Sequence, residues 1–271
     1  MRLWFLFTML VALAMPAGAA PRRVVSINLC TDQLALAVAA PGQLVSVSEL
    51  ARDPALSAMA SRAAAIPSNR GRAEEVLALR PDLVLASSLG DAATVRLLQR
   101  LGVSVALFDP AEDLEGIRDA LYRMGTLLGR APDAKARVRA FDRDIAPSLH
   151  PRGPRPLAAI YQANGYTTGP DSLAGRILDA AGFRNLAGEL GMQIGGTLAL
   201  EQLVAGRPDL LVLGPRYPGA SRSEEVLAHP ALRDLGARRL EIPDRAWLCG
   251  TPAVAEALRA LASARQRMIA P

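Results

Sequence analysis

The stretch RAEEVLALRPDLVLA, residues 72–86, decides the fold because it returns as LALEQLVAGRPDLLVLG, residues 198–214. The letters Arg-Pro-Asp-Leu end the helical part of each copy, and Glu74 falls on Glu201 at the same spacing. Each copy predicts a short helix that stops at a proline, because the residue before proline avoids helical angles, and then a buried apolar strand. A motif written twice in one chain predicts two lobes that are built alike.

The segments around the two copies predict a parallel α/β sheet in each lobe, because strand and helix patterns alternate there. The alternation stops between residues 113 and 145, where two helical patterns follow each other. One face of the first helix carries apolar residues three or four apart, which are Leu114, Ile117, Leu121, Met124 and Leu128. We therefore predict an α/β fold with two α/β lobes, residues 20–112 and 151–271. We expect a helical connection, residues 113–150, to contain a long interdomain helix and to leave a cleft between the lobes.

The first 19 residues are typical of a secretory signal peptide. Arg2 precedes an apolar run that is too short to span a membrane, and small residues then occupy positions 17 and 19. We expect cleavage between Ala19 and Ala20, which would leave a soluble protein in the periplasm. No cysteine ends the apolar run, so a lipid anchor is not expected.

The composition argues against nucleic-acid binding and gives no sign of catalytic machinery. The chain of 271 residues is 51% hydrophobic, and its formal charge of +5 comes almost wholly from scattered arginines, since Lys135 is its single lysine. Nucleic-acid proteins instead gather basic residues in runs or patches. The two histidines are each followed by proline, and the usual zinc-protease, dithiol, serine-hydrolase and phosphate-loop motifs do not occur. We expect a monomer that is not an enzyme and holds no cofactor or metal of its own.

The layout resembles the periplasmic substrate-binding proteins of ABC importers for iron-siderophores, haem and cobalamin, in which a long helix joins two lobes. The resemblance covers essentially the whole chain after residue 19. It rests on the doubled motif, on RRVVSINLCTDQLALAV at residues 22–38, and on WLCGTP at residues 247–252. It implies a receptor that captures a metal chelate and delivers it to an inner-membrane permease.

The resemblance also implies a role for the two matched glutamates. In this family a glutamate on the outer rim of each lobe docks against arginines of the permease, and the motif carries that role to Glu74 and Glu201. A simpler reading is that an acidic residue in a first helical turn is favoured by the helix dipole, with no partner at all. Two glutamates at equivalent places on opposite lobes favour docking, because paired charges set register and orientation.

The ligand site is expected at the carboxyl ends of the strands, where open α/β sheets bind ligands. We expect Tyr161, Tyr166 and Trp247 to stack on a macrocycle or on catecholate rings, and Arg70 or Arg216 to face anionic groups. For Tyr161 and Trp247 a purely structural role in the core is the alternative. The remaining candidates lie in loops that follow strands and are Asn28, Cys30, Asp32 and Asn69.

Three roles remain open for Cys30, which lies just before a helix. It is a ligand to metal, a disulfide partner of Cys249 in an oxidising compartment, or a small buried side chain.

The expected cargo is a preformed metal chelate, either a ferric siderophore or cobalamin or a related corrinoid. The cleft loops supply neither the several histidines of a zinc or manganese receptor nor a residue placed to ligate haem iron. Two other functions stay open, namely an exported enzyme that modifies a metal chelate and a ligand-binding sensor for a membrane receptor. An enzyme would need an acid/base pair, for which the loops between the lobes offer only Asp32 and Glu49. A sensor would need no paired rim glutamates.

Overall fold

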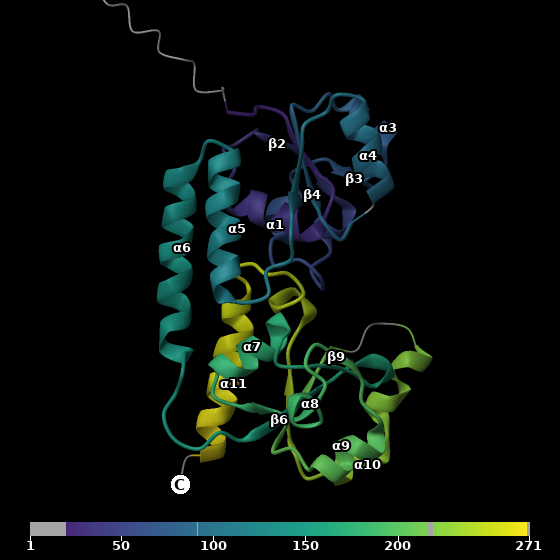
Figure 1. Cartoon of the computed structure of the whole chain (residues 1–271), viewed down its shortest axis with the longest axis vertical. Coiled ribbons are helices and arrows are strands. Elements are labelled where there is room, and N and C mark those ends of the chain that lie inside the picture. The colour runs from purple at the N-terminus through teal and green to yellow at the C-terminus, as the bar shows by residue number, and fades with distance from the viewer. Residues whose placement is uncertain (1–19, 91, 216–218, 220, 270–271) are drawn as a thin grey trace, which may run out of the picture.

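The computed structural model describes residues 20–90, 92–215, 219 and 221–269 and consists of two α/β lobes joined along one side by helices (Figure 1). The predicted signal peptide and Arg216 lie outside the described residues. The chain passes from the N-terminal lobe into the helices α5 and α6 and then into the C-terminal lobe, as the doubled motif predicts.

The N-terminal lobe contains a five-stranded parallel sheet in the order β3-β2-β1-β4-β5. Its strands are β1 (Val24–Ser26), β2 (Leu44–Ser48), β3 (Ser68–Asn69), β4 (Leu83–Ser87) and β5 (Val105–Phe108). Its helices are α1 (Leu29–Val38), η1 (Glu49–Arg52), α2 (Ala60–Ala63), α3 (Ala73–Ala78) and α4 (Ala92–Arg100).

The C-terminal lobe contains a four-stranded parallel sheet in the order β11-β10-β6-β8 and a separate antiparallel pair, β7 and β9. Its strands are β6 (Leu157–Tyr161), β7 (Tyr166–Thr168), β8 (Arg184–Asn185), β9 (Gly195–Thr197), β10 (Leu210–Leu213) and β11 (Arg238–Glu241). Its helical segments are η3 (Ala163–Gly165), α7 (Leu173–Ala180), α8 (Leu186–Glu189), α9 (Leu200–Gly206), η4 (Arg222–Ala228), α10 (Pro230–Asp234), η5 (Asp244–Ala246) and α11 (Val254–Ile269).

The connection between the lobes consists of α5 (Leu114–Leu127), α6 (Ala131–Ile145) and the short η2 (Ala146–Ser148), with α6 reaching along both lobes (Figure 1). Ile117, Leu121 and Met124 of α5 are fully buried, which confirms the apolar face that their spacing predicts. The two helices approach closely at Gly125, where a Cβ atom would collide with Ala134.

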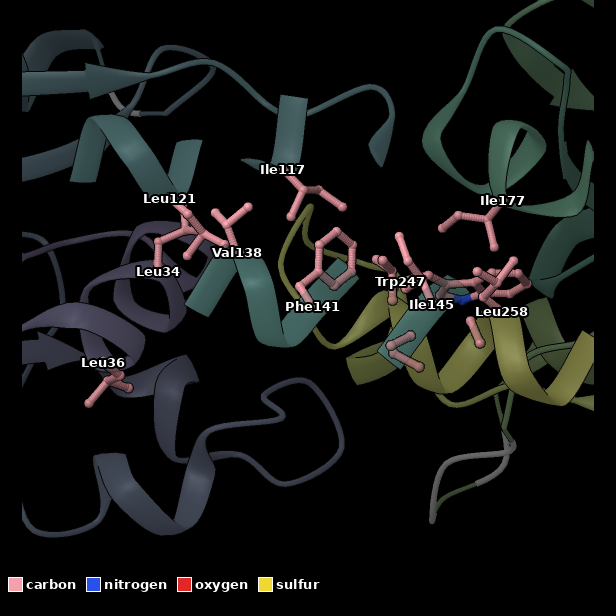
Figure 2. Packing of buried hydrophobic residues seen from close by; sticks show 14 of the residues in the cluster. Leu34, Leu36, Ile117, Leu121, Val138, Phe141, Ile145, Ile177, Trp247 and Leu258 are labelled. Carbon is pink, nitrogen blue, oxygen red and sulfur yellow. The ribbon is translucent and has the colours of Figure 1, made fainter. Parts of the chain in front are cut away.

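One hydrophobic core runs through both lobes instead of stopping at the boundary between them. It extends from α1 through the facing sides of α5 and α6 to α7 and α11, as Figure 2 shows with Leu34, Phe141 and Leu258. A smaller cluster on the other face of β6 and β10 completes the C-terminal lobe. The lobes are therefore held together by buried apolar surface as well as by the chain connection.

The doubled motif performs the same local task in each lobe. Arg80 and Arg207 end their helices in the left-handed region, with φ of 47° and 44°. The aspartate two residues later then holds the first strand of its lobe. The Asp82 carboxylate accepts hydrogen bonds from the backbone N–H groups of Arg22 and Arg23 at 2.7 and 3.0 Å, and Asp209 accepts one from Leu157 at 2.7 Å.

Candidate ligand-binding site

A cavity of about 320 Å³ lies between the lobes, at the low end of the ~300–1,000 Å³ typical of ligand pockets. The N-terminal lobe contributes the start of α1 after β1, the ends of β4 and β5, and residues 109–112. The C-terminal lobe contributes the start of α7, Ile194 and the segment that contains Trp247, Leu248 and Gly250. The carboxyl ends of parallel strands thus form one wall, as expected for an open α/β sheet.

Asn28 lines the cavity at the start of α1. Its side-chain oxygen accepts hydrogen bonds from the backbone N–H groups of Cys30 and Thr31 at 3.0 and 3.4 Å. Asparagine is a preferred cap because it satisfies N–H groups that have no partner inside the helix. The amide nitrogen of Asn28 has no hydrogen bond among the described residues, so it is available to a ligand.

Cys30 forms a disulfide bond with Cys249 across the two lobes, over a sequence separation of 219 residues. Of the three roles open for Cys30, the structure shows this one, so the possible thiolate ligand to metal is wrong. Cys30 belongs to the wall of the cavity, and Leu248 and Gly250 on either side of Cys249 belong to it as well. The disulfide therefore fixes the 247–250 segment against the N-terminal lobe at the ligand site.

Large apolar side chains form the C-terminal side of the cavity. Ile194 and Leu248 are 74% and 53% exposed although both are hydrophobic. Trp247 borders the cavity but is only 6% exposed and belongs to the main core. Exposed apolar residues gathered around a cavity are typical of a ligand surface. Trp247 thus has the core role given as the alternative and also borders the cavity, while its stacking on a ligand stays a prediction.

Asp32 and Asn69 were expected in the ligand site, but the structure gives both a structural role. Asp32 is fully buried, and its carboxylate accepts hydrogen bonds from the backbone N–H and the hydroxyl of Ser48. Burial raises the pKa of Asp32 to about 6, and hydrogen bonds from Ser26 and Ser48 partly oppose that shift. The side-chain amide of Asn69 donates to acceptors on β1 and β2, and its oxygen accepts from the Gly71 N–H.

Tyr161 also points away from the cavity. Its side chain is 1% exposed and packs in the smaller cluster with Leu186 and Leu198. Burial raises the pKa of its hydroxyl, and the nearby Glu201 raises it further. The alternative reading, in which Tyr161 ends a core strand, describes its position.

Arg70 and Tyr166 are exposed but do not belong to the wall of the cavity. The Arg70 guanidinium pairs with Glu49 at 2.9 Å, and the pair is more than half exposed on each side. The hydrogen bond from the guanidinium to Glu49 is the main cause that raises the pKa of Arg70, and the negative charges of Glu49 and Glu75 raise this pKa further. Arg70 thus has its own carboxylate partner outside the cavity.

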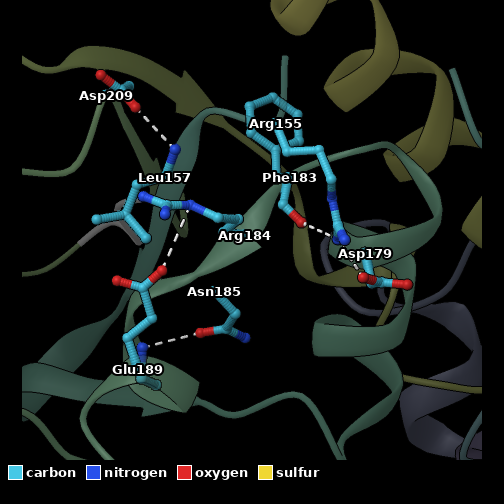
Figure 3. Close-up of polar contacts among 9 residues, drawn as sticks. Arg155, Leu157, Asp179, Phe183, Arg184, Asn185, Glu189 and Asp209 are labelled. Carbon is cyan, nitrogen blue, oxygen red and sulfur yellow. Dashed lines mark hydrogen bonds and ion pairs between the residues drawn. The ribbon is translucent and has the colours of Figure 1, made fainter. Parts of the chain in front are cut away.

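A larger hollow of about 720 Å³ follows α7 and β8, but the arginines in its wall are each paired with a carboxylate. Figure 3 shows Arg155 bonded to Asp179 and to the Phe183 carbonyl, and Arg184 beside Glu189. Arg118 and Arg176, the other arginines of this wall, also form ion pairs. We therefore assign the ligand to the cavity between the lobes.

Glu74 and Glu201 are exposed in the first turns of α3 and α9, which belong to different lobes (Figure 1). Neither carboxylate has an ion pair or hydrogen bond among the described residues. This is the arrangement that either docking or a simple helix-dipole role requires.

Sequence reasoning missed part of the cavity wall, namely residues 108–112, 171–173 and Ile194. The first of these follows β5, so the rule that ligands bind at strand ends was sufficient to find it. Asp171 and Ile194 carry no such signal. Asp171 lies just before helix α7, and Ile194 lies just before β9, a strand of the two-stranded sheet that the sequence did not predict.

Comparisons with known proteins agree with this architecture. A family model described as "Periplasmic binding protein" matches residues 24–239. The chain belongs to the periplasmic binding protein family. Within its described residues, no helix has the length and apolar character needed to cross a membrane.

Individual relatives bind different metal chelates, according to their names. A cobalamin-binding protein of Halobacterium salinarum is 27% identical over 217 residues, which cover 78% of this chain and 58% of that protein. The ferric enterobactin-binding periplasmic protein FepB of Escherichia coli is 28% identical over 163 residues, 57% of this chain and 49% of FepB. The chain thus spans about half the length of these relatives. A periplasmic heme-binding protein of Pseudomonas aeruginosa aligns with a TM-score of 0.70 at 26% identity, covering 90% of this chain and 92% of that structure.

Proposed function

We propose that this protein is a periplasmic receptor that binds a metal chelate, either a ferric siderophore or a corrinoid, and delivers it to an ABC importer. The observation that carries the proposal is the cavity between the lobes, walled by Ile194, Trp247 and Leu248 in a chain of this family. Large apolar faces are what a chelate or macrocycle presents to a protein. The named relatives bind ligands of this kind, which supports the proposal.

Delivery requires a partner in the inner membrane, and Glu74 and Glu201 are the proposed contacts. Two exposed carboxylates on separate lobes would each meet an arginine of the permease, so both lobes would be engaged at once. Export through the predicted signal peptide at residues 1–19 places the receptor in the same compartment as the permease's outer face.

The proposal is tested by binding without chemistry. Purified protein is titrated with a panel of chelates that comprises cyanocobalamin, a ferric hydroxamate, a ferric tris-catecholate and haemin, and the bound ligand is then extracted and analysed by absorption spectroscopy and mass spectrometry. We expect one site per chain for cyanocobalamin or for one of the ferric siderophores, and the bound chelate is recovered unchanged. A chemically altered chelate would favour the enzyme alternative. Binding of haemin alone, or of no member of the panel, would refute the proposal.

A further inference from the structure

The walls of the cavity carry an uneven distribution of charge. The ionisable side chains that line it are Asp109, Glu112 and Asp171, and all three are exposed. Among the described residues of the wall there is no arginine, lysine or histidine. This differs from a site for polyanionic ligands, which typically presents arginine or lysine to the ligand.

Nearby cations offset only part of this negative charge. Arg176 lies 3.4 Å from Asp171 and neutralises it in part. The Arg123 guanidinium lies over the Phe108 ring, 4.6 Å from its centre. Asp109 and Glu112 form no ion pair or hydrogen bond among the described residues. Within the part of the chain that the structure describes, these two carboxylates beside the cavity have no partner.

Two helix N-termini also meet the cavity, at α1 and at α7, and each carries a partial positive charge of about half a unit. Their first-turn N–H groups already bond to cap side chains, which are Asn28 in α1 and Ser172 in α7. Together the two termini amount to about one positive charge, against the two free carboxylates. Among the described residues, every charged side chain of the cavity wall is therefore acidic, and the helix termini offset only part of that charge.

We infer that the chelate bound in this cavity is neutral or cationic, and that Asp109 and Glu112 disfavour anionic chelates. The inference rests on the proposed function and narrows its ligand class. Like charges placed together in a binding site suppress the wrong partner and so produce specificity without new contacts. An uncharged or cationic macrocycle with amide groups fits both parts of the wall, because its apolar face meets Ile194 and Leu248 while the amide groups bond to polar cap residues.

The test compares ligands of different charge on charge-neutralised variants. Dissociation constants are measured by calorimetry for cyanocobalamin and a cationic ferric hydroxamate, and for an anionic ferric tris-catecholate and haemin. The protein is the wild type, the double variant Asp109→Asn, Glu112→Gln, and a control double variant Asp144→Asn, Glu241→Gln. The control residues are exposed, and neither has an ion pair among the described residues.

We expect the wild type to prefer a neutral or cationic chelate. The site double variant should shift the affinity ratio toward the anionic chelates by about tenfold, since each exposed charge contributes a factor of up to about five. The control should leave the ratio unchanged. Tighter binding of an anionic chelate by the wild type, or equal ratios in all three proteins, would overturn the inference while leaving the receptor function intact. Absence of binding to every chelate would refute the proposed function itself.

Discussion

At the scale of single residues, Asp32 makes stability depend on pH. Its pKa rises from 3.8 to about 6 on folding, so the native state binds a proton more tightly than the unfolded chain. The stability that this proton provides is fully present below pH 3.8 and is lost as the pH rises through about 6. Between pH 4 and pH 7 the loss amounts to about 2 kcal/mol.

The variant Asp32→Asn cannot titrate, so its free energy of unfolding should lack this component. Urea unfolding of both proteins from pH 4 to pH 7 measures the difference, and groups that titrate in both proteins cancel. We expect the wild type to lose stability relative to the variant as the pH rises. Parallel curves would show that Asp32 titrates alike in the folded and unfolded chains.

The aspartates of the doubled motif can be compared with each other. The Asp82 carboxylate accepts hydrogen bonds from two backbone N–H groups, and the Asp209 carboxylate accepts one. Hydrogen bonds to charged groups contribute more than neutral ones, although exposure reduces the gain. We expect Asp82→Ala to lower the free energy of unfolding by about 2 kcal/mol and Asp209→Ala by about 1 kcal/mol. The exposed Asp119, which forms no ion pair among the described residues, provides a control whose replacement by alanine changes stability by less than ~0.5 kcal/mol. Equal, negligible effects at all three positions would remove the strand-holding role.

At the scale of elements, the disulfide determines where the 247–250 segment lies. Replacing Cys30 and Cys249 together by serine should cost about 2–5 kcal/mol, because the bond closes a very long loop in the unfolded chain. The 247–250 segment should also become free to leave the N-terminal lobe, which weakens chelate binding. Reducing agent should lower wild-type stability to that of the double variant and leave the variant unchanged. A reduced wild type, verified by thiol titration, that keeps its full stability would contradict this account.

The elements themselves could be predicted because their signals are local. The two helical patterns expected between residues 113 and 145 are α5 and α6. Each copy of the doubled motif forms the expected short helix and strand, α3 with β4 and α9 with β10. The expectation that Tyr161 stacks on the ligand was wrong because side chains alternate between the two faces of a strand. Tyr161 lies on the same face of β6 as Leu157 and Ala159, and that face packs in the smaller cluster. Both faces of this strand are apolar, so the sequence does not show which one meets the cleft.

The polar candidates were separated only by the structure. Asp32 and Asn69 follow strands just as Asn28 does, and position in sequence does not reveal where a side chain finds its hydrogen bonds. Their partners lie in β1 and β2 and at Ser48, which come together only when the sheet forms. The choice among three roles for Cys30 likewise depended on the distance between the two lobes.

At the scale of the whole molecule, the shared core and the disulfide hold the two lobes together, so a partner can contact both lobes at once. We expect Glu74→Arg and Glu201→Arg each to cripple uptake while chelate affinity stays within about twofold, because like charges at a docking contact cost several kcal/mol. The double reversal should be worse than either single change. The free energy of unfolding should fall by no more than about 1 kcal/mol, the value of a helix-dipole interaction in an exposed turn.

Uptake is measured in cells with a labelled chelate, and the exposed Glu241→Arg serves as the control. Normal uptake by the double reversal would leave only the helix-dipole role for these residues.

The most direct test of the central claim, that a metal chelate binds between the lobes, is the dissociation constant of the tightest-binding chelate for the variant Ile194→Ala, Leu248→Ala. Both side chains are exposed at the cavity, so their truncation should spare the fold. A matched variant, Leu101→Ala with Leu190→Ala, removes equally exposed apolar groups outside the cavity wall. Loss of apolar contact from two side chains should weaken binding by about tenfold or more, since ~1.4 kcal/mol corresponds to a factor of ten, and the matched variant should bind like the wild type. Wild-type affinity in the cavity variant would contradict the placement of the ligand between the lobes.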